Sequence, residues 1–451
     1  MFRIYVERKP GFQSEAQSIL SEINGFLGIS SVKGVRYFNR YDIENTSEEV
    51  SKMAASRIFS EPQSDSVAYE EVKIDEKDTV IVWEYLPGQY DQRADSAEQC
   101  LSLLRESMKN SAKVCSLPPR VRCAKMVVLS GSIGADEIQK IQHYLINPVD
   151  SRLTDSKIPE TLEIKAAEPG DVPVVEGFNK FGKKELSEYI SKMGLAMDLP
   201  DIQFLQKYFK SIERDPTETE IRVLDTYWSD HCRHTTFNTV LKDIKIDKGP
   251  YAKLFKQSLE NYKALHTDLY ANRKDKPLTL MDMATIGGKY LRKHGMLDDM
   301  EVSEENNACS IFIDVHYTTD KDGNPYPEGK DEVEQWLLQF KNETHNHPTE
   351  IEPFGGAATC IGGAIRDPLS GRSWVYQSMR VTGASDPTVP MSETLHGKLP
   401  QLKLCREAAQ GFSSYGNQIG LTTGQVTEFY HPGFVAKRME LGAVIAASPY
   451  S

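Results

Sequence analysis

The stretch WLLQFKNETHNHPTE, residues 336–350, passes from an apolar segment directly into a run of ionisable side chains. Residues 336–341 have the composition of a buried strand, and the polar run begins where such a strand should end. Polar groups at the carboxyl ends of strands are typical of ligand sites in α/β sheets. Glu343, His345 and His347 alternate, so an extended chain would point all three to one side. A solvated strand end is the plain alternative.

Segments on both sides of this stretch predict an α/β region from about residue 230 onward. Apolar runs predict strands at 309–315, 336–341, 374–381 and 440–446, and helical spacing predicts a helix at 401–412. The last expected strand ends almost at the end of the chain with no partner following it, which makes the chain look cut.

The first 150 residues alternate short strands with helical stretches. We expect strands at 2–6, 32–38, 79–83 and 121–129, and helices at 14–26 and 96–108. Two strand–helix units with returning strands predict a duplicated α+β domain. Residues 151–173 mix charges with prolines and indicate a linker, after which 178–209 has helical periodicity.

Length, charge and cysteine content exclude several classes of protein. A chain of 451 residues should form two to four domains. The net charge of -12 argues against a general nucleic-acid binder, which needs basic surface. No apolar run reaches the roughly 18 residues that a membrane span needs. Seven cysteines form no CxxC pair, as expected for reduced thiols, so we expect a cytoplasmic protein.

A second polar cluster, WSDHCRHTTF, occupies residues 228–237 at the end of an expected helix. Its composition suits phosphate chemistry, in which arginine and hydroxyls hold anionic oxygens and histidine moves protons. A polar helix end is the plain alternative. His231 and His234 could also join Glu343 and His347 in the zinc site of a hydrolase, although the spacing matches no familiar zinc motif. Glu343 by itself suits Mg²⁺, which prefers oxygen ligands.

Small residues dominate the stretch PFGGAATCIGGAIRD, residues 353–367. Such a backbone can approach a phosphate chain closely, with helix N–H groups aimed at the anion. A tightly packed helix whose glycines face a neighbouring sheet is an equal alternative. Arg366 and Asp367 add a phosphate-binding cation beside a candidate Mg²⁺ carboxylate. Residues 411–420 contain turn-forming residues throughout and predict a loop.

Four segments of the chain, in the same order, resemble motifs of phosphoribosylformylglycinamidine synthase. They are PGQYDQRADS at 87–96, YWSDHCRHT at 227–235, ETHNHP at 343–348 and the glycine-rich stretch at 355–367. The first resembles a motif of the long, single-chain form. The resemblance implies a PurS-like duplicated α+β domain at 1–150, a helical linker domain at 151–215, an AIR-synthetase-like (PurM-like) domain that binds ATP and substrate at 216–434, and the start of its partner domain at 435–451.

The resemblance also implies an activity and its partners. The family converts formylglycinamide ribonucleotide, ATP, glutamine and water to formylglycinamidine ribonucleotide, ADP, phosphate and glutamate in purine biosynthesis. This chain would lack the second synthetase half and the glutaminase, so we expect it to be inactive alone. A non-catalytic assembly module is the rival without enzyme activity.

Motif positions imply the roles of individual residues. Catalytic roles fall on His231 and His345, and Mg²⁺ ligation falls on Glu343 and Asp367. Substrate contacts fall on Thr344, His345, Asn346, His347 and Arg366. Nucleotide contacts fall on Gly356, Ala357, Ala358, Thr359, Cys360, Ile361, Gly362, Gly363, Ala364, Ile365, Arg366 and Asp367. The family's two synthetase halves hold one working and one structural nucleotide site, so which role each residue keeps stays open.

Overall fold

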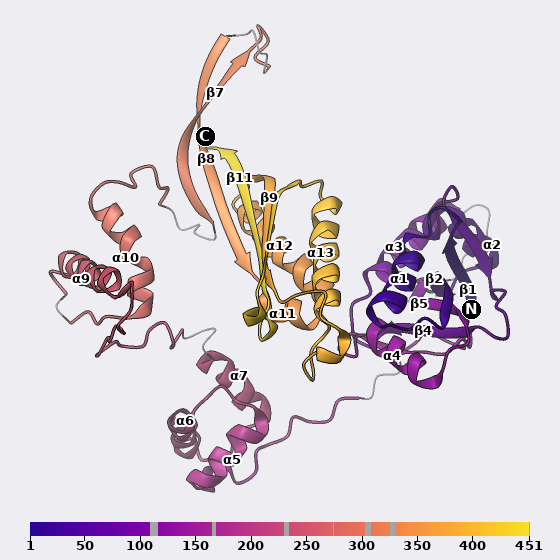
Figure 1. Ribbon diagram of the computed structural model, residues 1–451, viewed down its shortest axis with the longest axis horizontal. Helices are drawn as coiled ribbons and strands as arrows, with labels where there is room; N and C mark the ends of the chain where they lie inside the picture. The colour runs from indigo at the N-terminus through magenta and orange to yellow at the C-terminus, as the bar shows by residue number, and fades with distance from the viewer. Residues whose placement is uncertain are drawn as a thin grey trace. The chain divides into compact units, whose positions relative to one another are not determined.

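The computed structural model describes residues 1–108, 116–164, 168–229, 234–273, 275–302, 308–324 and 330–450. The chain divides into two units by its internal contacts, and Figure 1 labels the elements of each. One comprises Met1–Lys165 together with Glu301–Ser451, and the other comprises Ala166–Met300.

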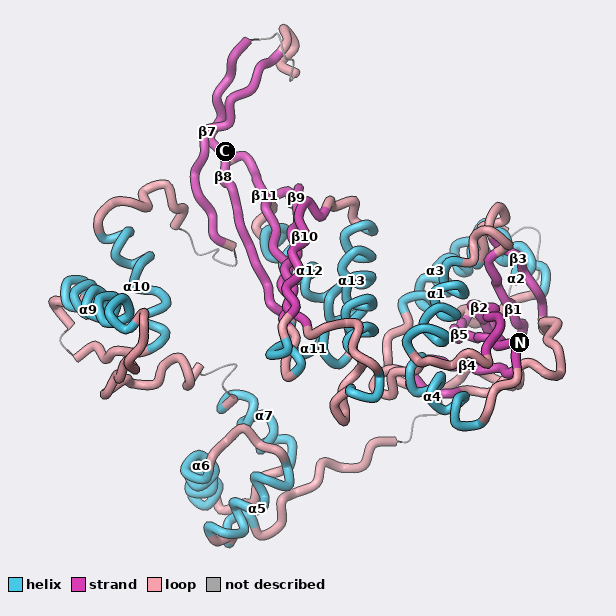
Figure 2. Tube along the Cα trace, in the orientation of Figure 1, coloured by secondary structure: helices cyan, strands magenta, loops and turns pink. Residues whose placement is uncertain are grey.

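The first unit contains two β-sheets (Figure 2). The first sheet has six antiparallel strands in the order β3-β1-β2-β5-β4-β6. Its strands are β1 (Phe2–Arg8), β2 (Val32–Glu44), β3 (Asp65–Tyr69), β4 (Thr79–Tyr85), β5 (Arg120–Gly131) and β6 (Ser151–Leu153). The helices between them are α1 (Ser14–Ser21), α2 (Glu48–Ala54), α3 (Gln92–Ser107) and α4 (Ala135–Leu145). The strands and helices expected in this region are therefore confirmed, and β2 and β5 are longer than expected.

The first sheet is ordered symmetrically about the β2–β5 pair. The chain passes through β1–α1–β2–α2–β3 and then through β4–α3–β5–α4–β6. In each half the second strand lies at the centre of the sheet, the first lies next to it and the third lies at the edge. Alternate residues of each strand point to opposite faces. Ile4 and Val6 of β1 therefore join the core beneath the helices, whereas Arg3 and Tyr5 face the other side of the sheet.

The second sheet has five strands in the order β10-β9-β11-β8-β7. They are β7 (Cys309–Thr319), β8 (Lys330–Thr344), β9 (Trp374–Ala384), β10 (Thr423–Tyr430) and β11 (Met439–Pro449). β9 and β10 are parallel, and the other neighbours are antiparallel. The long helices α12 (Pro353–Ser370) and α13 (Gln401–Gln418) pack against each other, and α12 lies on β8, β9 and β11 (Figure 1). The four strands expected in this region are confirmed.

The expected loop at 411–420 is wrong, because α13 continues to Gln418. A side chain on Gly411 would collide with the backbone carbonyl of Phe354 in α12. The glycine therefore allows two helices to approach closely, and it does not mark a turn. The helix ends just before Gly420, whose φ of +71° suits a residue without a side chain.

Two predicted domain boundaries fall inside packed structure. β11 pairs with both β8 and β9 at the centre of the second sheet, so a boundary at 435 would divide that sheet. In the second unit, α5 (Lys183–Met193), α6 (Leu199–Ser211) and α7 (Glu218–Trp228) share one apolar core, so the boundary between 215 and 216 would divide this core.

The remainder of the second unit contains α9 (Ala252–Leu269) and α10 (Leu280–Lys293). Tyr262 of α9 donates a hydrogen bond to the buried carboxylate of Asp282 in α10, with an O–O distance of 2.8 Å. Among the described helices of the chain, none combines the length and the apolar composition that a bilayer crossing requires.

Candidate functional site

The polar run after residue 341 forms the end of β8 and a sharp turn. β8 ends at Thr344, and the backbone N–H of His345 donates to the carbonyl of Glu440 at 2.9 Å. The short helix α11 (Asn346–Ile351) begins at the next residue. Of the three alternating side chains, only Glu343 lies in a strand. The prediction that all three share one strand face is wrong, because the chain has already turned at His345 and His347 lies within α11.

Two predicted site residues from different motifs, Glu343 and Asp367, both contact Lys341 near this strand end. Lys341 and Glu343 share the face of β8 that is covered by α12, where Gly363 packs beside the Glu343 side chain. Asp367 lies one helical turn after Gly363. The Lys341 ammonium is 2.6 Å from a carboxylate oxygen of Asp367 and 3.3 Å from one of Glu343. Its hydrogen bond to Asp367 raises the pKa of Lys341.

This pair of carboxylates has the chemistry to hold a hard cation, and the ammonium group of the Lys341 side chain lies between them. Carboxylate oxygens are the ligands that Mg²⁺ takes, usually together with phosphate oxygens and water. Within the described ranges, no three His, Cys, Asp or Glu side chains are grouped closely enough to hold a metal ion by themselves. Glu343 and Asp367 could therefore hold Mg²⁺ only with help from a ligand or water.

His345 is half-buried and lies near the carboxylates of Glu343 and Glu440. Burial lowers its pKa, and the nearby charges of Glu343 and Glu440 oppose that shift. A lowered pKa favours the neutral imidazole near pH 7, which is the form that accepts a proton.

The strand behind the turn is fixed by a buried ionic cluster. The Glu440 carboxylate is fully buried and accepts hydrogen bonds from Arg380 at 2.7 and 3.1 Å and from Arg438 at 3.1 and 2.8 Å. Both guanidiniums are themselves buried. The thiol of Cys360 in α12 lies against the carbonyls of Glu343 and Glu440. A rigid layer therefore supports the start of α11.

The glycine-rich stretch forms the body of α12, as in the packed-helix alternative. A side chain on Gly356 would come within 2.5 Å of the Thr349 backbone, and one on Gly362 would come within 2.8 Å of the Tyr415 ring. The first turn of the helix is capped by the Glu352 carboxylate, which accepts from the N–H of Gly355. Most of the residues expected to contact nucleotide are buried in this packing: Gly356, Ala357, Cys360, Ile361, Gly362, Ala364 and Ile365.

The exposed members of that stretch are Thr359 and Arg366. Their contacts with nucleotide or substrate stay predictions, as does the contact expected of Thr344, which is exposed at the end of β8.

The catalytic residue expected at His231 lies outside the described residues, together with its neighbours at 230–233. His234 is described, and its φ of +52° places it in the left-handed region. The zinc alternative gains no support from the described part of the chain.

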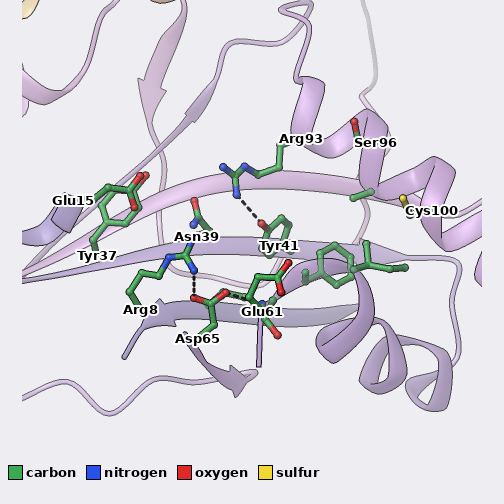
Figure 3. Close-up of a pocket in the computed structure, with 15 residues that line it drawn as sticks. Arg8, Glu15, Tyr37, Asn39, Tyr41, Glu61, Asp65, Arg93, Ser96 and Cys100 are labelled. Atoms are coloured by element: carbon green, nitrogen blue, oxygen red, sulfur yellow. Dashed lines mark hydrogen bonds and ion pairs between the residues drawn. The ribbon is translucent and has the colours of Figure 1, made fainter. Parts of the chain in front are cut away.

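Arg93 and Ser96 of the 87–96 motif line a cavity of about 340 Å³ that was not predicted from the sequence (Figure 3). The motif forms the turn before α3 and the first turn of that helix, which Asp91 caps. Arg93 faces the cavity and donates to the Tyr41 hydroxyl at 3.0 Å. On another wall, Arg8 pairs with Asp65 at 2.9 Å. Because both cationic walls have partners within the domain, we assign no ligand to this cavity.

Part of the second unit matches a described protein family. Residues 186–234, which include most of α5 and all of α6 and α7, match the formylglycinamide ribonucleotide amidotransferase linker domain.

Two curated relatives carry the same enzyme name. The phosphoribosylformylglycinamidine synthase of Saccharomyces cerevisiae is 28% identical over 271 residues, which cover 57% of this chain and 18% of that protein. The Schizosaccharomyces pombe enzyme of that name is 25% identical over 338 residues, which cover 69% of this chain and 23% of that protein. The chain therefore spans about a fifth of the length of these relatives.

Solved structures of Thermotoga maritima PurL also match. PurL complexed with FGAR aligns with a TM-score of 0.21 and 24% identity, over 26% of this chain and 16% of that one. PurL complexed with ATP aligns with a TM-score of 0.28 and 17% identity, over 55% and 27%. Through its linker domain and both curated relatives, the chain is similar to phosphoribosylformylglycinamidine synthases.

Proposed function

We propose that this chain is the ATP-binding and substrate-binding front portion of a phosphoribosylformylglycinamidine synthase. The similarity to the linker domain and to two enzymes of that name supports the family. The observation that carries the site is the contact between two motifs: Lys341 joins Glu343 of the 343–348 motif to Asp367 of the 355–367 motif.

The proposed reaction replaces an amide oxygen of formylglycinamide ribonucleotide by nitrogen. ATP transfers its γ-phosphoryl group to the amide oxygen, which gives an iminophosphate and ADP. Ammonia from glutamine then forms the new C–N bond, and inorganic phosphate leaves with the original oxygen. Such phosphoryl transfer depends mainly on positioning and on neutralising charge.

The residues near the end of β8 have separate roles in this proposal. Mg²⁺, when bound, would neutralise phosphate charge. Glu343 and Asp367 are the carboxylates placed to hold it, and Lys341 must then move from between them. His345 and His231 are the proposed proton-transfer residues. Thr344 to His347 and Arg366 would contact the ribonucleotide, and residues 356–367 would border the nucleotide.

The rest of the family architecture is part of the same proposal. We propose a PurS-like duplication in the first 150 residues, which the symmetric strand order about β2 and β5 supports. The region around the second sheet would be AIR-synthetase-like. The second synthetase half and the glutaminase would be supplied by further chain or by a partner subunit.

Titration calorimetry on the purified chain tests the site. We expect Glu343→Gln to weaken Mg·ATP binding at least tenfold, because one of two anionic oxygen ligands is lost. Asp331→Asn removes an exposed carboxylate at the far end of the same strand and should leave binding unchanged. Equal affinities in wild type and Glu343→Gln would remove Glu343 from the site. The chain alone should show no turnover with glutamine or with ammonium salts.

A further inference from the structure

The segment just before and at the start of β11 holds the side chains of the 345–347 turn in one orientation. The Nζ atom of Lys437 is 2.6 Å from Nδ1 of His347. Three residues later, the backbone N–H of Glu440 donates to Oδ1 of Asn346 at 2.8 Å. Both bonds therefore join α11 to residues about ninety positions away in the sequence.

These two bonds fix which atoms of the turn can face a ligand. An ammonium group only donates, so Nδ1 of His347 must be the acceptor and the ring proton must lie on Nε2. A backbone N–H also only donates, so the oxygen of the Asn346 amide accepts from Glu440 and its Nδ2 group keeps its two hydrogens for another partner. The turn consequently presents two hydrogen-bond donors, Nδ2 of Asn346 and Nε2–H of His347.

The support behind these bonds is rigid, whereas Lys437 itself is exposed. The Glu440 carboxylate is clamped by two buried arginines, and the backbone N–H of Arg438 donates to Glu350 at 2.9 Å. Substituting Lys437 should therefore change the orientation of His347 without disturbing the core.

We propose that Lys437 is a positioning residue that, with the backbone of Glu440, turns Asn346 and His347 into a pair of donors for an oxygen acceptor on the substrate. This inference rests on the proposed function and makes its substrate contact specific. In formylglycinamide ribonucleotide, the 5′-phosphate and the amide carbonyls are such acceptors. A ligand group that itself donates at this position is rejected, because it would meet two further donors.

The hydrogen-bond polarity can be measured without any ligand. In ¹⁵N NMR spectra of histidine-labelled protein, assigned with a His347→Gln variant, His347 should carry its proton on Nε2 alone. In Lys437→Met we expect both neutral tautomers, and in Lys437→Arg the wild-type pattern. A proton on Nδ1 of His347 in the wild-type protein overturns the inference.

Calorimetric titration with formylglycinamide ribonucleotide tests the consequence. Lys437→Met should weaken binding roughly five- to tenfold, the value of one oriented hydrogen bond, and Lys437→Arg should restore it. Lys140→Met, at an exposed lysine of α4, is the matched control and should bind as wild type does.

Asn346→Asp is the sharper variant, because it keeps an acceptor for the Glu440 N–H but replaces the Nδ2 donor with an oxygen. We expect it to weaken binding roughly a hundredfold, since an anionic oxygen would face the ligand's own acceptor. Titration of the dephosphorylated nucleoside separates the two sources: a phosphate contact predicts a much smaller loss with the nucleoside, and a carbonyl contact predicts an equal loss. Unchanged affinity in Asn346→Asp overturns the inference. Absence of ribonucleotide binding in the wild type, with His347 protonated on Nε2, overturns the proposed function instead.

Discussion

Each sheet of the first unit buries one carboxylate between two arginines. The residues are Arg3, Asp42 and Arg40 in the first sheet and Arg380, Glu440 and Arg438 in the second. All six side chains are at most 4% exposed, so in both sheets the charges are nearly dry. The same chemistry therefore occurs twice, and the difference lies in what it supports.

In the first sheet, the spare donors hold a crossing segment of backbone. Arg3 donates to the carbonyls of Ser156 and Lys157 at 2.6 and 3.0 Å, and Arg40 donates to that of Asp155 at 2.8 Å. These bonds fasten the chain after β6 across the face opposite the helices. The role of this cluster is therefore structural, because it attaches residues 155–157 to the sheet.

In the second sheet, the clamped residue is in direct contact with the candidate site. The backbone of Glu440 accepts from the N–H of His345 and donates to the side chain of Asn346. One buried cluster therefore secures a chain crossing, and the other fixes the turn that should meet substrate. Disrupting either cluster should lower the free energy of unfolding by a similar amount. Only disruption of the second-sheet cluster should weaken substrate binding.

The largest effect is expected from removing either carboxylate. Asp42→Ala leaves two buried guanidiniums without a carboxylate partner. Glu440→Ala leaves Arg438 without one and leaves Arg380 with only the partly exposed Glu428, at 3.4 Å. Each substitution should lower the free energy of unfolding by about 3–5 kcal/mol. Urea denaturation followed by circular dichroism measures this. In buffer without urea, where both variants stay folded, only Glu440→Ala should weaken binding of formylglycinamide ribonucleotide. Equal loss of binding in Asp42→Ala would contradict the conclusion that only the Glu440 cluster supports the binding site.

Local pattern was enough to predict most of the strands, but it missed β3, β6 and β10 and did not predict these clusters. Apolar runs located the central strands of both sheets, because burial imposes a period of two along the chain. The partners of Asp42 and Glu440 depend on pairing between distant strands, which no local spacing reveals. His347 and Lys437 likewise meet only after β11 has joined β8.

The glycine-rich segment at 411–420 shows why composition alone does not separate a loop from a packed helix. Gly411 and its neighbours have the composition of a loop, and the same small residues also allow α13 to lie against α12. Whether the segment forms a loop or a helix depends on whether α12 packs against it. That contact belongs to the tertiary structure and cannot be predicted from the local sequence. At 355–363 both alternatives could be stated, but the choice between them required the contact with Thr349 and Tyr415.

A pair of glycine substitutions sharpens the comparison between the layers on the two sheets. Gly411→Ala in α13 should lower the free energy of unfolding by about 1–3 kcal/mol, because the added methyl group meets a backbone carbonyl that cannot rotate away. Gly25→Ala, after α1 in the first sheet's layer, meets nothing within 4 Å and should be neutral or slightly stabilising. Thermal unfolding of the two variants makes the measurement. A stable Gly411→Ala protein would show that α12 and α13 can move apart at little cost.

A smaller effect is expected for an exposed ion pair in the second unit. Arg214 donates to Glu220 at 2.9 Å and, with the backbone N–H of Thr217, lowers the pKa of Glu220 to about 2. Since the pKa is lowered on folding, the stabilisation is fully present above the ordinary value of 4.5 and is lost as the pH falls from there to about 2. Glu220→Gln should cost under about 1 kcal/mol at pH 7, because the pair is partly solvated.

The origin of this effect is tested by repeating the unfolding measurement at different salt concentrations and pH values. The difference between Glu220→Gln and wild type should shrink in 1 M salt and should close as the pH approaches about 2. The losses in Asp42→Ala and Glu440→Ala should hardly respond to salt, because those charges are buried. A salt-independent loss in Glu220→Gln would mean that its cap on α7, and not its charge, is what stabilises the helix.

The mildest test needs no mutation. It compares how fast the cysteine thiols of the two sheets react with an alkylating reagent. Burial raises the pKa of Cys360, beside Glu440, to about 12, and it raises that of Cys123 in the first sheet well above the ordinary value of 9.0. Cys100 and Cys309 are exposed. The thiolate is the reactive form, so at pH 8 Cys360 should react with iodoacetamide roughly a thousandfold more slowly than an exposed thiol whose pKa is ordinary. Peptide mapping after timed labelling should find Cys100 and Cys309 modified before Cys123 and Cys360. Early labelling of Cys360 would mean that α12 separates from β11 in solution, and the rigid support claimed for the 345–347 turn would then be wrong.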